Sequence, residues 1–188
     1  QGGLTCVTGS ANLVKKVAFP REILPVSQVA ANGIGYLLSL LVQFPILAFL
    51  LWHGGSGFSS QWPLFVFWMA WQTVFNLGLA LLVGALNVNF RDTQHLVGVG
   101  LSAWFFLSPV MYNMEFARNL AASWPWAVEL LYANPLAPIL NGYRAALLPA
   151  AAAGFPPAAW VGFALAPLTL LLGALVFRRL QKNFADLL

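Results

Sequence analysis

Charged residues divide the chain into long apolar blocks. Lys, Arg, Asp and Glu are all absent from residues 23–90, 93–114 and 145–177. A helix that crosses a bilayer needs about 20 mostly apolar residues. The first block has room for two such helices, and each of the others has room for one. The pattern therefore predicts an all-α integral membrane protein with about four transmembrane helices.

The predicted spans cover residues 24–52, 63–86, 96–112 and 158–177. Residues 1–22 are polar and basic, residues 87–95 form a short polar turn, and residues 178–188 form a basic tail. Residues 113–157 have mixed polarity and contain two apolar pieces, near residues 124–132 and 138–148. Because each piece is too short to cross the bilayer, we predict short re-entrant or interfacial helices there.

Basic residues in short loops predict the orientation of the spans. Only Arg118 and Arg144 lie on one predicted face of the membrane. The bias places both ends of the chain and the turn at residues 87–95 in the cytoplasm. The seven basic residues on that face are Lys15, Lys16, Arg21, Arg91, Arg178, Arg179 and Lys182.

Composition excludes several classes of protein. The 188 residues include nine Lys and Arg and five Asp and Glu, so 7% are charged, whereas 60% are hydrophobic. Soluble domains carry about 25% charged residues, and disordered chains are poor in hydrophobic residues. The basic residues are spread along the chain rather than gathered in a patch, which argues against a nucleic-acid binder.

The sequence lacks the motifs of several catalytic and energy-coupling classes. It contains no phosphate-binding Gly-rich loop, no His-Glu-x-x-His and no Gly-x-Ser-x-Gly. The histidines, His53 and His95, fall on opposite predicted faces, so no metal site is expected. No Asp or Glu lies inside a predicted span, which argues against a proton relay. We expect a transport subunit rather than an enzyme, with its energy supplied by another subunit.

Amide side chains are the notable polar groups inside the predicted spans. Gln72 and Asn76 are four residues apart and share one helix face. Two interpretations stay open, namely hydrogen bonding between helices and the lining of a hydrophilic pathway. Small residues four apart predict close helix packing at three places, which are Ala31/Gly35, Ala80/Gly84 and Gly98/Ser102.

An aromatic cluster lies in the third predicted span. Trp104, Phe105 and Phe106 are consecutive, and Tyr112 follows near the outer end. One interpretation places these rings in the lipid-facing belt or the core. The other is a set of faces that stack on sugar rings along a translocation pathway.

The segment at residues 12–22 combines apolar and basic positions. Apolar residues stand at helical spacing around Lys15 and Lys16, and Pro20 ends the predicted helix before the first span. The segment is either an interfacial anchor or a docking helix that receives force from a cytoplasmic partner.

Five stretches of the chain form a distinctive set. They are Asn12-Leu-Val-Lys-Lys-Val-Ala-Phe-Pro-Arg-Glu-Ile-Leu-Pro25, residues 85–97, Trp104-Phe-Phe-Leu-Ser-Pro-Val-Met-Tyr112, Asn134-Pro-Leu-Ala-Pro-Ile-Leu-Asn-Gly-Tyr-Arg144, and the tail at residues 176–186. Taken in order, they resemble the ABC-transporter permeases that export cell-surface polysaccharides, which are the type-2 exporter permeases for O-antigen, capsule and teichoic acid.

The resemblance implies a six-span permease subunit, of which this chain would be the C-terminal two-thirds. Two permease copies would pair with two copies of a separate ATPase, which would hold ATP and Mg, so no cofactor is expected in this chain. The implied location is the bacterial cytoplasmic (inner) membrane. The implied cargo is a lipid-linked polysaccharide or polyol-phosphate polymer. Without the two further spans, the chain is expected not to form a working transporter.

The resemblance also assigns roles to segments and residues. Residues 12–22 become the coupling helix that meets the ATPase, and residues 113–157 become a pair of outer helices that gate the exit. Ala18, Asn113 and Asn141 depart from the family, which usually has an aromatic residue, a proline and an acidic residue there. The ATPase-coupling residues would be Lys15, Lys16, Phe19, Pro20, Arg21 and Glu22, with Arg91 and Asp92 forming either a second contact or a local salt bridge. The pathway residues would be Gln72, Asn76, Trp104, Phe105, Phe106 and Tyr112.

Other functions remain open at this point. One is a type-2 ABC exporter of a small lipophilic drug or a lipo-oligosaccharide. A more remote one is a membrane-embedded transferase, which would need acidic residues or histidines clustered at a cleft. A purely structural scaffold would not need amides and prolines inside its spans.

Overall fold

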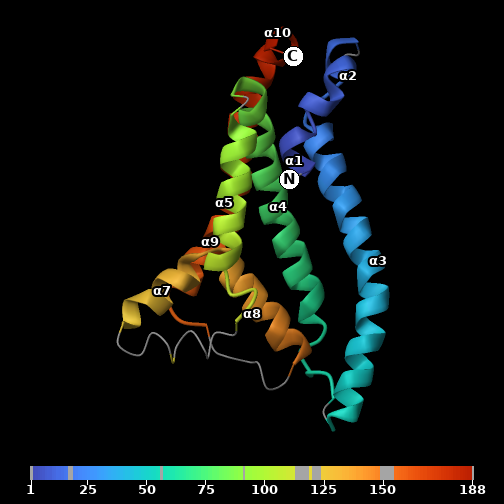
Figure 1. Cartoon of the computed structure of the whole chain (residues 1–188), viewed down its shortest axis with the longest axis vertical. Coiled ribbons are helices and arrows are strands. Elements are labelled where there is room, and N and C mark those ends of the chain that lie inside the picture. Colours follow the sequence, from blue (N-terminus) through green and yellow to red (C-terminus); the bar gives the residue numbers. More distant parts are fainter. Residues whose placement is uncertain are drawn as a thin grey trace. The chain divides into compact units, whose positions relative to one another are not determined.

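The computed structural model describes residues 2–16, 19–55, 57–90, 92–112, 119, 124–148 and 155–187. These ranges contain helices and no strand. Figure 1 shows the helices coloured along the chain. They are α1 (Gly2–Thr5), η1 (Thr8–Ser10), α2 (Ala11–Lys16), α3 (Ile23–His53), α4 (Leu64–Asn89), α5 (Thr93–Leu107), α7 (Pro125–Ala133), α8 (Leu136–Leu147), α9 (Ala159–Leu180), η3 (Gln181–Asn183) and α10 (Phe184–Leu187).

Three helices in the described part are long and apolar enough to cross a membrane. They are α3, α4 and the continuous run of α9 and η3. Each begins within one residue of a span predicted from the charge-free blocks. The all-α membrane class is thereby confirmed.

Helix α5 differs from the span predicted at residues 96–112. It has 15 residues and ends at Leu107. Pro109 lacks an N–H and disfavours a helical conformation in the residue before it, so the helix stops there. A helix of this length is shorter than the roughly 20 residues that a bilayer requires, and the third span therefore stays a prediction.

Helix α4 extends past the span predicted at residues 63–86, as far as Asn89. The side chain of Asn87 is buried and donates a hydrogen bond to the carbonyl of Leu4 at 3.0 Å. The predicted polar turn at residues 87–95 is therefore helical at both ends, because α5 already begins at Thr93.

The chain folds as two compact units. The first unit comprises residues 1–34, 73–103 and 166–188, and the second comprises residues 35–72 and 104–165. The helices α3, α4, α5 and α9 contribute residues to both units. Each unit is described separately below.

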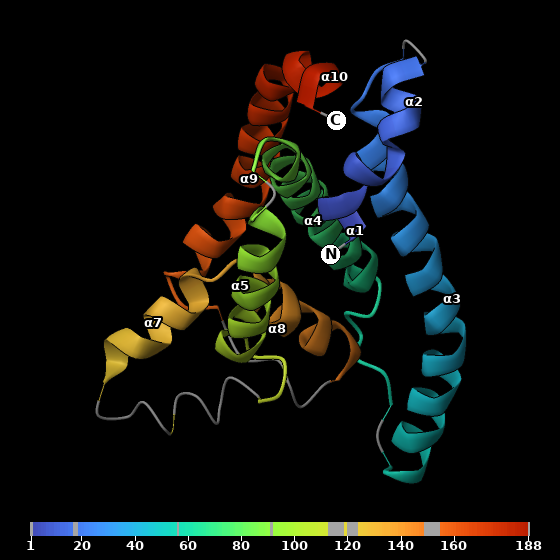
Figure 2. The ribbon, with the colours of Figure 1, turned by 45° about the horizontal axis from the view of Figure 1, so that its top comes forward.

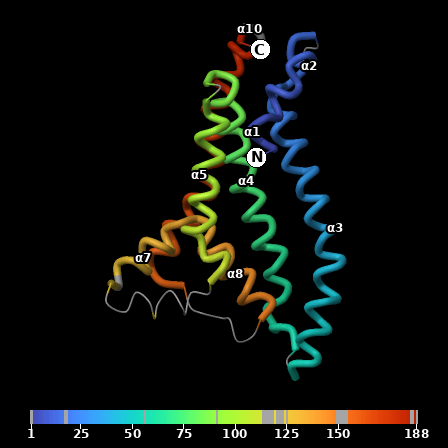
Figure 3. Tube along the Cα trace, viewed as in Figure 1, coloured from blue at the N-terminus to red at the C-terminus, as the bar shows by residue number. Residues whose placement is uncertain are grey.

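In the first unit, the N-terminal residues pack closely on α4. A Cβ atom added at Gly3 would lie 2.6 Å from the Cβ of Ala80, and one added at Gly84 would lie 2.8 Å from the carbonyl oxygen of Gly3. Figure 3 shows α1 beside α4. The polar composition of residues 1–22 did not predict this packing, which depends on small residues on both sides of the contact. The Ala80/Gly84 pair does pack as its spacing predicted.

A second close approach joins α4 and α9 through two glycines. A Cβ atom at Gly78 would overlap the backbone of Thr169 and Leu170, and a Cβ atom at Gly173 would overlap the carbonyl of Gly78. Because neither residue has a side chain, the two helices cross backbone against backbone. By contrast, a Cβ built at Gly35 or Gly98, in the other two predicted pairs, meets no described atom within 4 Å beyond the neighbouring backbone of its own helix.

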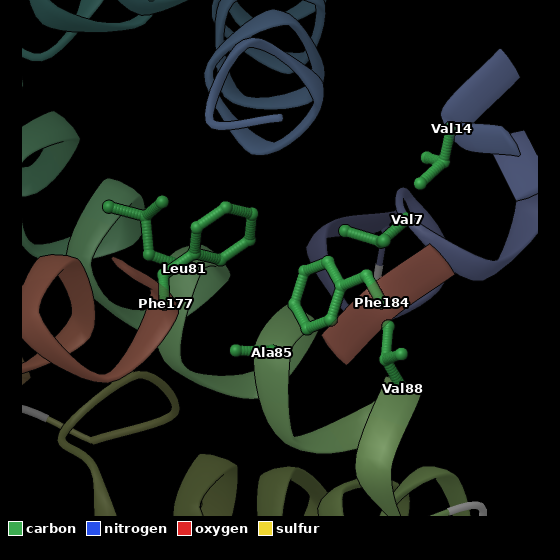
Figure 4. Packing of buried hydrophobic residues seen from close by; sticks show 7 residues of the cluster. All are labelled: Val7, Val14, Leu81, Ala85, Val88, Phe177 and Phe184. Atoms are coloured by element: carbon green, nitrogen blue, oxygen red, sulfur yellow. The ribbon is translucent and has the colours of Figure 1, made fainter. Parts of the chain in front are cut away.

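Seven buried side chains form the core of the first unit, and Figure 4 shows them together. They come from α2, α4, α9, α10 and the turn after α1, so segments far apart in sequence meet there. Phe19, from the segment between α2 and α3, and Leu24, from the first turn of α3, pack against this core. The seven are Val7, Val14, Leu81, Ala85, Val88, Phe177 and Phe184.

The second unit contains the helix pair α7 and α8, which leave the turn between them in different directions (Figure 2). Helix α8 packs on α4 because the indole of Trp68 lies directly over Gly142. Phe65 and Ala146 complete a small core there. Gly162 of α9 fits against the carbonyl of Tyr132 at the end of α7. These contacts fix α7 and α8 as ordered helices at the positions of the two predicted short pieces.

Candidate functional site

The predicted functional residues fall into two groups. The ATPase-coupling candidates belong to the first unit, together with Asn76. The other pathway candidates, Gln72, Trp104, Phe105, Phe106 and Tyr112, belong to the second unit. Each group is described within its own unit.

Helix α2 carries the central coupling candidates. Val14 is buried in the core of the first unit, whereas Lys15 and Lys16 are exposed in the last turn. Cations at a helix C-terminus are stabilised by the partial negative charge of its free carbonyls. The helix therefore presents two positive charges outward while an apolar residue anchors it. Of the predicted coupling helix at residues 12–22, residues 12–16 belong to α2 and residues 19–22 are not helical, while residues 17 and 18 lie outside the described residues.

The residues that follow α2 contact other parts of the first unit. Phe19 is partly buried against the core, and Pro20 is exposed. The guanidinium of Arg21 donates a hydrogen bond to the carbonyl of Gln181 in η3. Glu22 accepts a hydrogen bond from the Nε of Arg178 at 2.9 Å, which is also an ion pair. Arg21 and Glu22 therefore both bind the C-terminal segment of the chain.

The second predicted coupling pair is only half described. Arg91 lies outside the described residues. Asp92 is exposed, and its carbonyl accepts hydrogen bonds from the backbone N–H groups of His95 and Leu96 at 3.1 and 3.2 Å. An acidic residue at the N-terminus of α5 also stabilises the helix through its dipole.

The aromatic candidates differ in exposure. Phe105 and Phe106 are 44% and 73% exposed, whereas Trp104 is half-buried. The indole N–H of Trp104 donates to the Oδ1 of Asn134 at 2.9 Å. The hydroxyl of Tyr112 donates to the carbonyl of Leu107 at 3.5 Å. Trp104 is thus held by the turn between α7 and α8, while the two phenylalanines present their faces outward.

Asn134 is a functional candidate that sequence reasoning did not select. Its Nδ2 donates to the Oγ of Ser108 at 2.9 Å, and its Oδ1 also accepts from the N–H of Leu136 at 3.1 Å. The Oγ of Ser108 donates in turn to the carbonyl of Trp104 at 2.7 Å. One amide therefore ties the start of α8 to the end of α5. The Asn-Pro pair before a helix is a local signal for such a turn, but its partner Trp104 could not be read from the sequence.

Arg144 is a second residue that sequence reasoning treated only as a loop charge. Its guanidinium donates to the carbonyls of Pro109, Val110 and Tyr112 at 2.7, 3.1 and 3.0 Å. These carbonyls follow the end of α5 and have no helical partner there. A planar guanidinium with five N–H donors is suited to several acceptors at once. Arg144 thus fixes the chain that leaves α5 against α8.

The two intramembrane amides have different surroundings. The Oε1 of Gln72 accepts a hydrogen bond from the hydroxyl of Tyr143 in α8 at 2.7 Å. Asn76 is exposed. Gln72 is thus engaged in bonding between helices, which is the first of its two interpretations, and a pathway role for it stays a prediction. Asn141 is buried, and an amide avoids the large cost of burying a carboxylate at that site.

No set of three His, Cys, Asp or Glu side chains that could hold a metal ion comes together within the part of the chain that the structure describes. The two groups instead offer exposed cations on α2 and aromatic faces on α5. These features suit contacts with other molecules.

Comparison with known proteins supplies the context for these features. The family described as ABC-2 type transporter matches residues 2–148. The chain is 34% identical, over 154 residues, to the O-antigen export system permease protein RfbA of Myxococcus xanthus, covering 77% of this chain and 52% of that protein. Two proteins of the same name from Klebsiella pneumoniae are 28% and 27% identical, each over 72% of this chain and 49% of the relative. The chain thus spans about half the length of these curated relatives.

Proposed function

Because the chain belongs to the ABC-2 type transporter family, we propose that it forms part of the permease subunit of an ATP-driven exporter. The proposed cargo is a lipid-linked polysaccharide or polyol-phosphate polymer. The observation that carries this proposal is the similarity to O-antigen export permeases over about three quarters of the chain. The three apolar helices supply a membrane-embedded body for such a subunit.

The energy for transport would come from a separate ATPase subunit that binds ATP and Mg. The sequence contains no phosphate-binding loop of its own. Helix α2 supports this partnership because its exposed Lys15 and Lys16 are held in place by the buried Val14. A second copy of the permease would complete the pathway, and both ends of this chain would face the cytoplasm of the bacterial cell.

The cargo pathway would use the aromatic faces on α5. Phe105 and Phe106 are exposed, and Trp104 is oriented by Asn134. Aromatic rings offer large apolar faces on which sugar rings stack. Helices α7 and α8, which Asn134 and Arg144 join to the end of α5, would move with that helix as an outer gate.

Deleting the gene that encodes this chain, in a cell that makes a surface glycan, tests the proposal. We expect the surface glycan to disappear and its lipid-linked precursor to accumulate inside the cell. Restoring the full-length gene should restore display, provided that the partner ATPase is also present. A normal surface glycan in the deleted cell would overturn the proposal. The loss of a small lipophilic or lipo-oligosaccharide product instead would identify the alternative cargo.

A further inference from the structure

The C-terminal segment of the chain, residues 178–187, contacts the segment that leads from α2 into α3. Arg178 forms an ion pair with Glu22 at 2.9 Å. The carbonyl of Gln181 accepts a hydrogen bond from Arg21. Arg21 and Glu22 are adjacent, so two polar contacts join the same short segment to the end of α9 and the start of η3. All of these residues belong to the first unit.

A buried aromatic residue of α10 anchors the C-terminal segment, residues 178–187, to the core of the first unit. Phe184 is fully buried and packs edge-to-face on Phe177 of α9, with ring centroids 5.4 Å apart. It shares its core with Val14 of α2 and Val88 of α4, as Figure 4 shows. Edge-to-face aromatic pairs have a preferred geometry and so fix the rings relative to each other. The apolar core therefore joins α2 to α9 and α10, and the polar contacts join residues 21–22, which lead into α3, to the same C-terminal segment.

The charges of this region divide into two sets. Arg21, Glu22 and Arg178 have partners within the chain. Lys15 and Lys16 are exposed on α2. The second set is placed to meet a partner molecule, whereas the first set connects the elements beneath it.

We propose that residues 178–187 form a clamp that couples the movement of α2 to α9, with Arg21, Glu22 and Arg178 as positioning residues rather than ATPase contacts. This proposal rests on the proposed export function. An ATPase that moves α2 through Lys15 and Lys16 would also move α9, because the clamp makes the two helices one mechanical element. Coupling between distant sites travels through such contiguous contacts, and its existence has to be shown by a coupling measurement.

Charge reversal tests the clamp in the full-length permease assembled with its ATPase. The single variants are Glu22→Arg and Arg178→Glu, and the double variant exchanges the two charges. The readout is the amount of glycan exported per ATP hydrolysed. An exposed ion pair contributes little to folding stability, so the variants should reach the membrane and retain the ATPase. We expect each single variant to lower the ratio about fivefold or more and the double variant to restore most of it.

A matched control uses Arg179, the exposed neighbour of Arg178. Combining Glu22→Arg with Arg179→Glu exchanges the same charges at the wrong position, and the ratio should stay low. Single variants with a normal ratio would overturn the clamp. Rescue by the Arg179 combination as effective as rescue by Arg178 would also overturn it, because the effect would then reflect net charge alone.

A cross-linking measurement separates the clamp from the export function. Cysteines are introduced at Glu22 and Arg178 in a full-length permease whose other cysteines, including Cys6, are replaced. A short bifunctional maleimide should join the two positions within one chain, and mass spectrometry should recover the joined peptides. A failure to cross-link would overturn the clamp. Because the cysteine variant itself lacks the ion pair, the proposed function is read from the gene deletion instead: efficient cross-linking together with a normal surface glycan in the deleted cell would support the clamp and reject the proposed function.

Discussion

At the scale of single residues, Asn134 places one amide at the junction of three chain segments. It accepts hydrogen bonds from Trp104 and from the N–H of Leu136, and it donates one to Ser108. Replacing it with Leu, which has a similar volume, leaves the indole N–H of the half-buried Trp104 and the buried hydroxyl of Ser108 without this partner. We expect the free energy of unfolding to fall by about 1–3 kcal/mol, measured as a lower thermal midpoint of the purified permease.

The control for this prediction is Asn76→Leu, which makes the same chemical change at an exposed position of α4. Its midpoint should stay close to that of the unmodified protein. An equal decrease of the thermal midpoint in the two variants would show that the Asn134 hydrogen bonds do not stabilise the fold. A loss at Asn76 alone would indicate that this amide, rather than Asn134, joins the permease to another copy.

Cys6 gives a prediction about pH. Burial raises the pKa of its thiol from 9.0 to about 11, and the thiol donates a hydrogen bond to the carbonyl of Gly3. Because the pKa is higher in the folded chain than in the unfolded chain, this group favours folding below about pH 9 and loses that contribution as the pH approaches about 11. The thiolate is the form that reacts with alkylating reagents.

Alkylation of Cys6 in the native permease should therefore be slow at pH 8. A shift of two pKa units leaves about 100-fold less thiolate than in the unfolded chain. The measurement compares iodoacetamide incorporation in native and detergent-denatured protein between pH 7 and pH 10, with Cys6→Ser as the blank. Equal rates in the two states would contradict the partly buried position of the thiol.

At the scale of elements, the crossing of α4 and α9 depends on Gly78 and Gly173. A methyl group at Gly78 would overlap the backbone of α9, so the helices would have to separate. We expect Gly78→Ala to lower the free energy of unfolding by about 1–3 kcal/mol through overpacking. Thermal unfolding of the purified permease, followed by size-exclusion chromatography, measures the effect.

Gly33→Ala is the matched control for this crossing. Gly33 lies inside α3, and a Cβ built there meets no described atom within 4 Å beyond the neighbouring backbone of its own helix. Alanine reduces the conformational freedom of the unfolded chain, so the free energy of unfolding of this variant should rise by about 0.5–1 kcal/mol. A stabilising effect of Gly78→Ala similar to that of Gly33→Ala would contradict the close crossing.

The positions of the helices could be predicted where the absence of charged residues determines them. The ends of the helices were harder to predict where tertiary packing determines them. The charge-free blocks located α3, α4 and α9 to within a few residues, because a long apolar helix is required wherever a chain crosses a bilayer. The end of α5 depended on Pro109 and on the bond from Ser108, and α4 lengthened because Asn87 found a partner at Leu4. The contact between Gly78 and Gly173 was not predicted, because each glycine is required only by the close backbone of the other helix.

At the scale of the whole molecule, the sequence motifs marked out segments but did not indicate which residues they contact. The motif at residues 12–25 was selected as a distinctive stretch, yet the partners of Arg21 and Glu22 lie about 160 positions away in the sequence. Asn134 and Arg144 stood inside a recognised motif without a role, since their partners, in the last turns of α5 and in the residues after it, become neighbours only in the folded chain. Tertiary contacts of this kind have no signature in the local sequence.

The two interpretations of Lys15 and Lys16 make different predictions for the assembled transporter. Both residues are exposed, so reversing their charges removes no folding contact that the structure shows. In a docking surface, Glu at both positions would meet the ATPase with repulsive charge. We then expect co-purification of the ATPase and glycan export to be lost, while the amount of permease in the membrane stays unchanged. The charge-conserving Lys15→Arg, Lys16→Arg variant should retain both activities.

If the two lysines serve only as anchors at the cytoplasmic face, the same reversal acts at a different step. It would weaken the bias that orients the neighbouring spans, and the amount of correctly inserted permease would fall. The molecules that still insert correctly would bind the ATPase normally. The ratio of bound ATPase to inserted permease therefore distinguishes the two interpretations, and an unchanged ratio in the Glu variant would rule out a docking role for α2.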